Sequence, residues 1–179
     1  NIAPDLQLKV LEQMSTRPKL IALDTMNFWI DDHRSRLTDV IKEVDILFMD
    51  QDEIRSFTKV SNIFTAVKKV RELGPRIVVV KKGEHGSILS GPKGLFIAPA
   101  YPLKKVVDPT GAGDSFVGGM MGYLASQKGS IEKNLRCGII HGSVAASYCC
   151  EAFGLKKTAK IKKADITKRV RELTKMASW

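Results

Sequence analysis

The sequence is poor in cysteine and in aromatic residues, and it has no long uninterrupted apolar segment. Its three cysteines, Cys137, Cys149 and Cys150, follow neither a zinc-ligand spacing nor a disulfide framework, which is typical of a reducing compartment. No stretch approaches the roughly 18 apolar residues of a membrane-spanning helix, and no signal peptide leads the chain. We therefore expect a cytoplasmic protein without a membrane partner.

An initiator methionine is also lacking, because the chain begins Asn1-Ile2-Ala3-Pro4. A helix-like pattern follows at once, so we expect the chain to open in the middle of a fold whose N-terminal half is missing. The 179 residues are expected to form a single domain, 1–179, with a substantial core.

Acidic residues are scarce at the C-terminal end. From Lys156 to Trp179 nine Lys or Arg face only Asp165 and Glu172, which supplies +7 of the net charge of +10. A nucleic-acid patch would have this charge, but the segment lacks interleaved aromatics. Its apolar residues, including Ile166 and Leu173, have the spacing of a helix with one apolar stripe. We therefore favour a solvated basic helix face, with nucleic acid as the lesser alternative.

Strands and helices alternate along the chain, which predicts an α/β fold with a largely parallel sheet. Expected strands are 19–23, 45–49, 76–80 and 105–107, and expected helices are 34–43, 63–73, 114–126, 131–150 and 163–176, with a further helix starting at 50–53. The run 76–80 is continuously apolar, as in a buried parallel strand. Segments 87–90 and 94–98 predict an antiparallel hairpin at the sheet edge.

The most informative stretch is Val107-Asp-Pro-Thr-Gly-Ala-Gly-Asp-Ser-Phe-Val-Gly-Gly-Met120. Gly111 and Gly113 remove the Cβ atoms that would keep an anion from the backbone. The helix start offers unpaired N–H groups for phosphate oxygens. Asp114 adds a carboxylate that can accept a proton from a hydroxyl attacking a phosphoryl group. No Gly-Lys-Ser/Thr follows, so this is not a Walker loop. The structural alternative is a glycine-rich turn with Asp114 as the helix cap.

Two further segments follow expected strands, where ligands of open α/β sheets gather. The first is Lys81-Lys-Gly-Glu-His-Gly86, a turn that can approach a nucleotide or simply carry solvated lysines. The second is Asp50-x-x-Glu53, in which two carboxylates on one helix face can organise hydrated Mg²⁺ or serve only as helix caps.

The 107–120 stretch resembles the Asp-Thr-x-Gly-Ala-Gly-Asp signature of the PfkB/ribokinase family, with Pro109 in second place, and the resemblance extends through most of residues 20–155. It implies a ribokinase-like three-layer αβα fold, of which this chain is the C-terminal, nucleotide-binding part. It also implies ATP and Mg²⁺ as cofactors. The implied reaction is transfer of the ATP γ-phosphate to a sugar hydroxyl. A nucleoside kinase of the same superfamily and a non-catalytic nucleotide-binding relative remain alternatives.

The resemblance assigns roles to individual residues. Asp114 is the expected base, and the expected anion hole is formed by the backbone of Gly111, Ala112, Gly113 and Asp114. The nucleotide-binding residues implied are Lys81, Gly83, Glu84, Gly86, Gly113 and His141. In the 81–86 loop Lys81 stands where the family usually has Thr, and His141 stands where the family often has Asn beside the base.

Metal ligands are implied in the same way. Glu53 matches the family's Asn-x-x-Glu motif for Mg²⁺, whereas Asp50 stands in place of the Asn. Asp108 and Thr110 match positions that hold a monovalent cation, K⁺, in some relatives, with Phe153-Gly154 completing that site. Asp24-x-x-Asn27 is similar to a segment near the active cleft of fructokinase-like members, although the adjoining aromatic residues also suit the core. The resemblance further implies a sugar substrate, a homodimer in the complete protein, and no activity of this chain alone.

Overall fold

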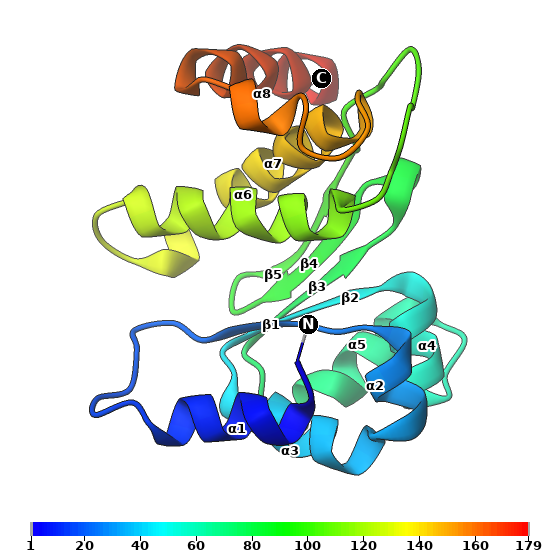
Figure 1. Ribbon diagram of the computed structural model, residues 1–179, viewed down its shortest axis with the longest axis vertical. Coiled ribbons are helices and arrows are strands. Elements are labelled where there is room, and N and C mark those ends of the chain that lie inside the picture. Colours follow the sequence, from blue (N-terminus) through cyan, green and yellow to red (C-terminus); the bar gives the residue numbers. More distant parts are fainter. Residues whose placement is uncertain (1, 179) are drawn as a thin grey trace. The chain divides into compact units, whose positions relative to one another are not determined.

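The computed structural model describes residues 2–178, which form an α/β protein (Figure 1). The strands are β1 (Ala22–Asp24), β2 (Ile46–Asp50), β3 (Ile77–Lys81), β4 (Ser87–Gly91) and β5 (Gly94–Ala98), and they are ordered β1-β2-β3-β4-β5 in the sheet. The α-helices are α1 (Pro4–Glu12), α2 (Asn27–Asp32), α3 (Arg34–Glu43), α4 (Gln51–Thr58), α5 (Ile63–Arg71), α6 (Ala112–Ser126), α7 (Ile131–Cys150) and α8 (Lys163–Ala177). Two short 3₁₀ turns, η1 (Gly83–His85) and η2 (Thr158–Lys160), complete the description.

The chain divides into two compact units. Unit 1 covers the chain up to Lys81 together with Ser90–Gly94, and unit 2 covers Lys82–Leu89 and the chain from Leu95 onward. Among the described residues, no helix combines the length and apolar character needed to cross a membrane.

Unit 1 is built on parallel strands. β1 pairs with β2 and β2 pairs with β3, both in parallel, and the second pairing runs from Ile46 opposite Ile77 to Asp50 opposite Lys81. The first four residues of β2 and of β3 are buried, as expected for parallel strands covered on both faces. The helices α3, α4 and α5 lie along one side of these strands (Figure 1). The prediction of a largely parallel sheet is confirmed.

The predicted hairpin is also present. β4 and β5 are neighbours in the sheet, and only two residues separate them, a connection that joins antiparallel strands. Because β5 is last in the strand order, the hairpin ends the sheet on that side.

In unit 2, α6 and α7 pack closely because small residues face each other. A Cβ on Gly119 would lie 2.5 Å from the Cβ of Ala145, and one on Gly142 would lie 2.7 Å from the Phe116 carbonyl oxygen. Larger residues at either glycine would push the helices apart. This contact confirms that the small residues predicted in 131–150 permit close packing.

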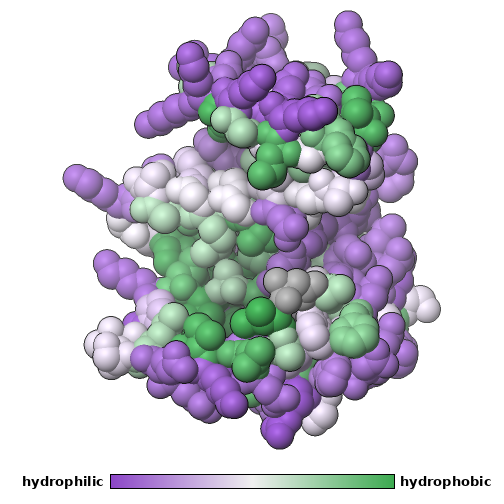
Figure 2. Space-filling view, in the orientation of Figure 1, coloured by the Kyte–Doolittle hydropathy of each residue, from purple (hydrophilic) through white to green (hydrophobic). Residues whose placement is uncertain are grey.

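The last helix, α8, packs on α7 through an apolar stripe. Leu173 is buried with Val144 and Tyr148, and Ile166 and Val170 pack against them. The Arg169 guanidinium lies 3.6 Å from the ring centroid of Tyr148. Arg169 also contacts Tyr101, the Ser147 hydroxyl and both carboxylate oxygens of Glu151. Hydrophilic side chains crowd the outer surface over α8 (Figure 2), as a helix with one solvated basic face should show.

Two local expectations fail. Residues 105–107 form no strand; Val106 and Val107 are exposed, and the Val107 and Asp108 amides donate to the Cys150 carbonyl oxygen instead of to a neighbouring strand. In addition, α2 was not predicted, and its Phe28 is exposed at the surface rather than in the core.

Candidate functional site

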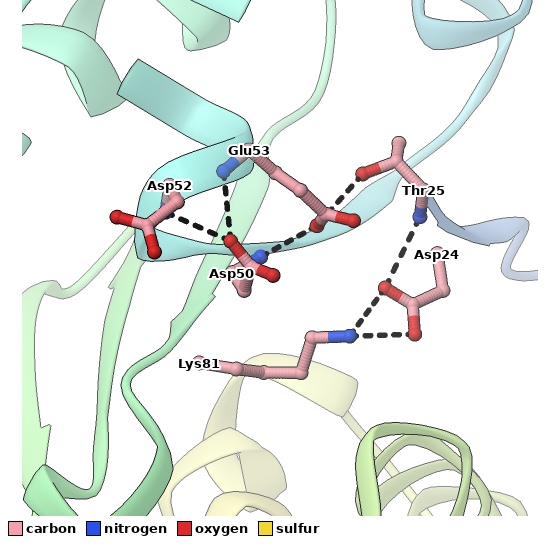
Figure 3. Close-up of polar contacts among 6 residues, drawn as sticks. All are labelled: Asp24, Thr25, Asp50, Asp52, Glu53 and Lys81. Atoms are coloured by element: carbon pink, nitrogen blue, oxygen red, sulfur yellow. Dashed lines mark hydrogen bonds and ion pairs between the residues drawn. The ribbon is translucent and has the colours of Figure 1, made fainter. Parts of the chain in front are cut away.

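The three parallel strands of unit 1 end in polar residues at the same edge of the sheet. β1 ends at Asp24, β2 at Asp50 and β3 at Lys81. The Lys81 Nζ atom donates to Asp24 Oδ1 at 2.6 Å and to Asp24 Oδ2 at 2.7 Å (Figure 3). Both side chains are largely buried, with 16% of Lys81 and 22% of Asp24 exposed. The predicted site residue Lys81 is therefore held in a bidentate ion pair.

Glu53 lies beside this pair on the first turn of α4. Its Oε2 atom accepts hydrogen bonds from the Asp50 amide at 2.7 Å and from the Thr25 hydroxyl at 3.1 Å (Figure 3). Only 5% of Glu53 is exposed. This burial raises the pKa of Glu53 from its ordinary value of 4.5 to about 7, against the opposing effect of the Asp50 amide. A carboxylic acid that titrates near neutrality is uncommon outside functional sites.

Asp50 serves as the N-cap of α4. Its Oδ1 atom accepts from the Asp52 amide at 2.8 Å and the Glu53 amide at 2.7 Å, and Glu53 returns a bond to the Asp50 amide. This reciprocal arrangement is a capping box. Asp50 therefore serves as a helix cap, which was the structural alternative expected from the sequence. A role of Asp50 in binding a metal ion stays a prediction.

The segment 82–86, in unit 2, is a tight turn closed by the Lys82 amide donating to the Gly86 carbonyl oxygen at 2.8 Å. Gly86 has φ +82°, and a Cβ there would lie 2.0 Å from the Ala98 carbonyl oxygen. Only glycine fits this position. Gly83 has φ +56° with open space around it, and the side chain of Glu84 is exposed. The amides of Lys82, His85 and Gly86 donate within the turn, and a contact of the turn with a nucleotide stays a prediction.

The helix α6 begins at Ala112, two residues before its expected start at Asp114, so residues 112–114 form its first turn. Gly111 is the N-cap, with φ +80°, so Asp114 is not the cap but lies in the first helical turn. Within the described residues, the Gly113 and Asp114 amides donate no hydrogen bond, whereas the Ala112 amide donates to the Pro109 carbonyl oxygen at 3.0 Å. The exposed Asp114 carboxylate forms no hydrogen bond or ion pair with any described residue. Two amides and one carboxylate are therefore available to a ligand.

The loop before α6 is ordered by Asp108. Its Oδ1 atom accepts from the Thr110 amide at 2.9 Å. Hydrogen bonds from the amide and hydroxyl of Thr110 lower the pKa of Asp108, and the Gly154 amide contributes in the same direction. The structure thus brings Asp108, Thr110 and Gly154 together. Binding of a monovalent cation at this loop stays a prediction.

His141 occupies an interhelical contact. Its ring stacks on Tyr123 with centroids 4.0 Å apart, and its Nδ1 atom lies 2.8 Å from the Cys137 carbonyl oxygen. The stacking on Tyr123 connects α7 with α6, whereas the contact with Cys137 lies within α7, and both give His141 a structural role. A contact of His141 with the base of a nucleotide stays a prediction.

Two features of the hydrogen-bond network in unit 1 were not predicted from the sequence. Thr25 was not considered, and the pairing of Asp24 with Lys81 joins residues 57 apart. A usable signal existed, since Asp24 and Lys81 each directly follow an expected strand. Within residues 2–178, no three His, Cys, Asp or Glu side chains are grouped so as to hold a metal ion by themselves. A single buried carboxylate suits Mg²⁺ that keeps its waters and phosphate ligands.

Taken together, an α/β fold with a parallel sheet and a glycine-rich anion turn at a helix start defines a class of phosphate-binding proteins. Within that class, residues 5–160 match the model of the pfkB family carbohydrate kinases. The chain belongs to this family, and the predicted resemblance is confirmed.

Individual relatives agree with this assignment. The chain is 30% identical to a cytidine kinase of Thermococcus kodakarensis over 145 residues, which are 77% of this chain and 50% of the relative. A fructokinase structure from Vibrio cholerae O395, with fructose, ADP and calcium bound, matches with a TM-score of 0.81 at 17% identity, over 93% of this chain and 55% of the other.

An aminoimidazole riboside kinase structure from Salmonella enterica, complexed with aminoimidazole riboside and an ATP analog, matches with a TM-score of 0.74 at 24% identity. That match covers 84% of this chain and 52% of the other. The chain therefore spans about half the length of these relatives, and the predicted ribokinase-like fold is confirmed.

Proposed function

We propose that this chain is the nucleotide-binding part of a kinase that transfers the γ-phosphate of ATP to a hydroxyl of a sugar or sugar-containing acceptor. The observation that carries the proposal is the start of α6, where the Gly113 and Asp114 amides and the Asp114 carboxylate are all unengaged among the described residues. The amides would stabilise negative charge on the phosphates. Asp114 would accept the proton of the attacking hydroxyl as the new O–P bond forms and the bond to ADP breaks.

Groups for the nucleotide are proposed in both units, each considered by itself. In unit 1, Lys81 would supply a positive charge for a phosphate oxygen, and the buried Glu53 carboxylate would help to hold hydrated Mg²⁺. In unit 2, the turn that contains Gly83, Glu84 and Gly86 offers its backbone, and His141 offers a ring edge. Bound Mg²⁺ neutralises charge on the phosphates, which is its usual contribution in such enzymes.

The acceptor is either a free sugar or a nucleoside. Relatives named cytidine kinase, nucleoside kinase and aminoimidazole riboside kinase favour an acceptor in which a ribose carries a base. A relative named bifunctional ribokinase/ribose-5-phosphate isomerase A and the fructokinase structure favour a free sugar. ADP release measured over a panel of pentoses, hexoses and ribonucleosides would separate the two. Failure of every acceptor would favour a non-catalytic nucleotide-binding relative.

The base assignment has a direct test in the complete protein. Asp114→Asn should leave the affinity for ATP nearly unchanged, because the backbone amides survive. Turnover should fall on the order of 10²–10⁴-fold, the usual contribution of a general base. Near wild-type turnover of the variant would remove Asp114 from this role. We expect the 179-residue chain alone to bind nucleotide without phosphorylating an acceptor, since its relatives are about twice as long.

A monovalent cation is proposed at the loop that contains Asp108 and Thr110. The convergence of the Thr110 and Gly154 amides on Asp108 supports an ordered loop that a cation could stabilise further. Kinase activity should rise when K⁺ replaces a bulky organic cation. Equal rates in the two salts would show that Pro109 and these hydrogen bonds order the loop without a cation.

A further inference from the structure

The ion pair between Lys81 and Asp24 joins two strands that are not neighbours. β2 lies between β1 and β3 in the sheet, so the Lys81 side chain reaches past the end of β2 to Asp24. The pair is largely buried and its two N–O distances are 2.6 and 2.7 Å. Lys81 is also the last residue before the 82–86 turn. The ion pair therefore fixes the position of the positively charged Lys81 ammonium group at the carboxyl edge of the sheet.

The number of donors on Lys81 limits what the pair can do. An ammonium group has three N–H donors, and the two carboxylate oxygens of Asp24 occupy at most two of them. At least one donor remains, and the contact with both oxygens restricts its direction. An unpaired lysine side chain would instead sample many rotamers and lose that freedom on binding a ligand. The ion pair thus orients one N–H of Lys81 so that it can donate to an anionic acceptor.

Asp24 is itself held in place. Its Oδ1 atom also accepts from the Thr25 amide at 3.1 Å, and the Thr25 hydroxyl donates to Glu53. Figure 3 shows the resulting network, which runs from Lys81 through Asp24 and Thr25 to Glu53. Its two ends are the groups proposed above for a phosphate oxygen and for Mg²⁺.

We propose that Asp24 is a positioning residue for nucleotide binding, which acts by holding the Lys81 ammonium with one N–H directed to a phosphate oxygen. The proposal rests on the proposed function. A largely buried ammonium needs a counter-charge when no ligand is bound. Asp24 supplies that charge.

The test is isothermal titration of the 179-residue chain with Mg-ATP and Mg-ADP, applied to Asp24→Asn, Lys81→Met and the double variant. Lys81→Met should weaken Mg-ATP binding about tenfold or more, and Asp24→Asn about three- to tenfold, as expected for loss of a charge-assisted hydrogen bond. Because Asp24 acts through Lys81, the double variant should bind no more weakly than Lys81→Met alone. Asp24→Glu keeps a carboxylate within reach of Lys81 and should restore most of the affinity.

Asp45→Asn is the matched control for general loss of stability. Asp45 is a similarly buried carboxylate paired with Arg17 and Arg76, but it precedes β2, at the opposite edge of the sheet. Asp45→Asn should lower the melting temperature and leave Mg-ATP affinity unchanged.

Three outcomes would overturn the proposal. In the first, Asp24→Asn binds Mg-ATP with wild-type affinity while Lys81→Met binds it weakly. In the second, the fold losses of Mg-ATP affinity in the two single variants multiply in the double variant. The third is failure of the unmutated chain to bind Mg-ATP, which would also remove the proposed nucleotide-binding function. The first two outcomes leave that function standing.

Discussion

Glu53 makes the stability of this protein depend on pH in a way that a single substitution should remove. Its pKa is raised from 4.5 to about 7, chiefly by burial. Between these values the folded protein retains a proton that the unfolded chain has lost. The contribution of Glu53 to stability should therefore be greatest below about pH 4.5, fall as the pH rises through this interval, and level off above about pH 7.

The size of the effect follows from the pKa difference. Each pKa unit corresponds to about 1.4 kcal/mol, so the shift of Glu53 lowers the free energy of unfolding by about 3 kcal/mol at pH 8 relative to pH 4. In Glu53→Gln, the side-chain carbonyl can still accept from the Asp50 amide and the Thr25 hydroxyl. Because glutamine does not ionise, the variant should not lose this free energy of unfolding as the pH rises. The variant should match the wild type at pH 4 and exceed it by about 3 kcal/mol at pH 8.

Urea unfolding of both proteins at intervals from pH 4 to pH 9 would measure this difference. Asp52→Asn is the control, because Asp52 lies on the same helical turn but its side chain is 78% exposed. That variant should retain the wild-type dependence on pH. The reasoning would be refuted if Glu53→Gln showed the same decline between pH 4.5 and 7 as the wild type, or if it were less stable than the wild type at pH 8.

Two further predictions concern packing in unit 2, and thermal or urea unfolding checks both. Gly86→Ala should cost on the order of 3 kcal/mol, because its Cβ would collide with the Ala98 carbonyl oxygen, whereas Gly83→Ala should cost only about 1 kcal/mol; equal losses would contradict the collision. Arg169→Met should cost about 2 kcal/mol, because it removes the bidentate partner of the largely buried Glu151 carboxylate, which keeps only its ion pair with Lys157. The exposed Lys168→Met is its control, and a similar loss there would show that the ion pair contributes nothing specific.

Much of the fold could be predicted because its elements have strong local patterns. The helix 34–43 and the helix 131–150 have the expected bounds, and the apolar runs of β2 and β3 differ from expectation by one residue. The failed strand at 105–107 shows the limit of such patterns. A short apolar run becomes a strand only if another strand supplies hydrogen-bond partners, and here the Cys150 carbonyl oxygen accepts the Val107 amide.

The candidate site was less predictable, because its decisive contacts are not local. The sequence indicated that Asp24, Asp50 and Lys81 follow or end strands, but not which of them pair. The order of strands in the sheet decides this, since it places β2 between β1 and β3. Asp50 caps α4, and Lys81 pairs instead with Asp24 at the end of β1.

Helix capping does not fully account for the Asp50-x-x-Glu53 pair. A capping box needs Glu53 to reach the Asp50 amide, and an exposed glutamate can do so without a raised pKa. Here the carboxyl group is almost fully buried and accepts a second hydrogen bond from Thr25. Burial of this kind lowers stability near neutral pH, and a glutamine would keep the same hydrogen bonds without that loss. A carboxyl group kept at such a position therefore favours a role for its charge, which is the role the proposed Mg²⁺ contact requires.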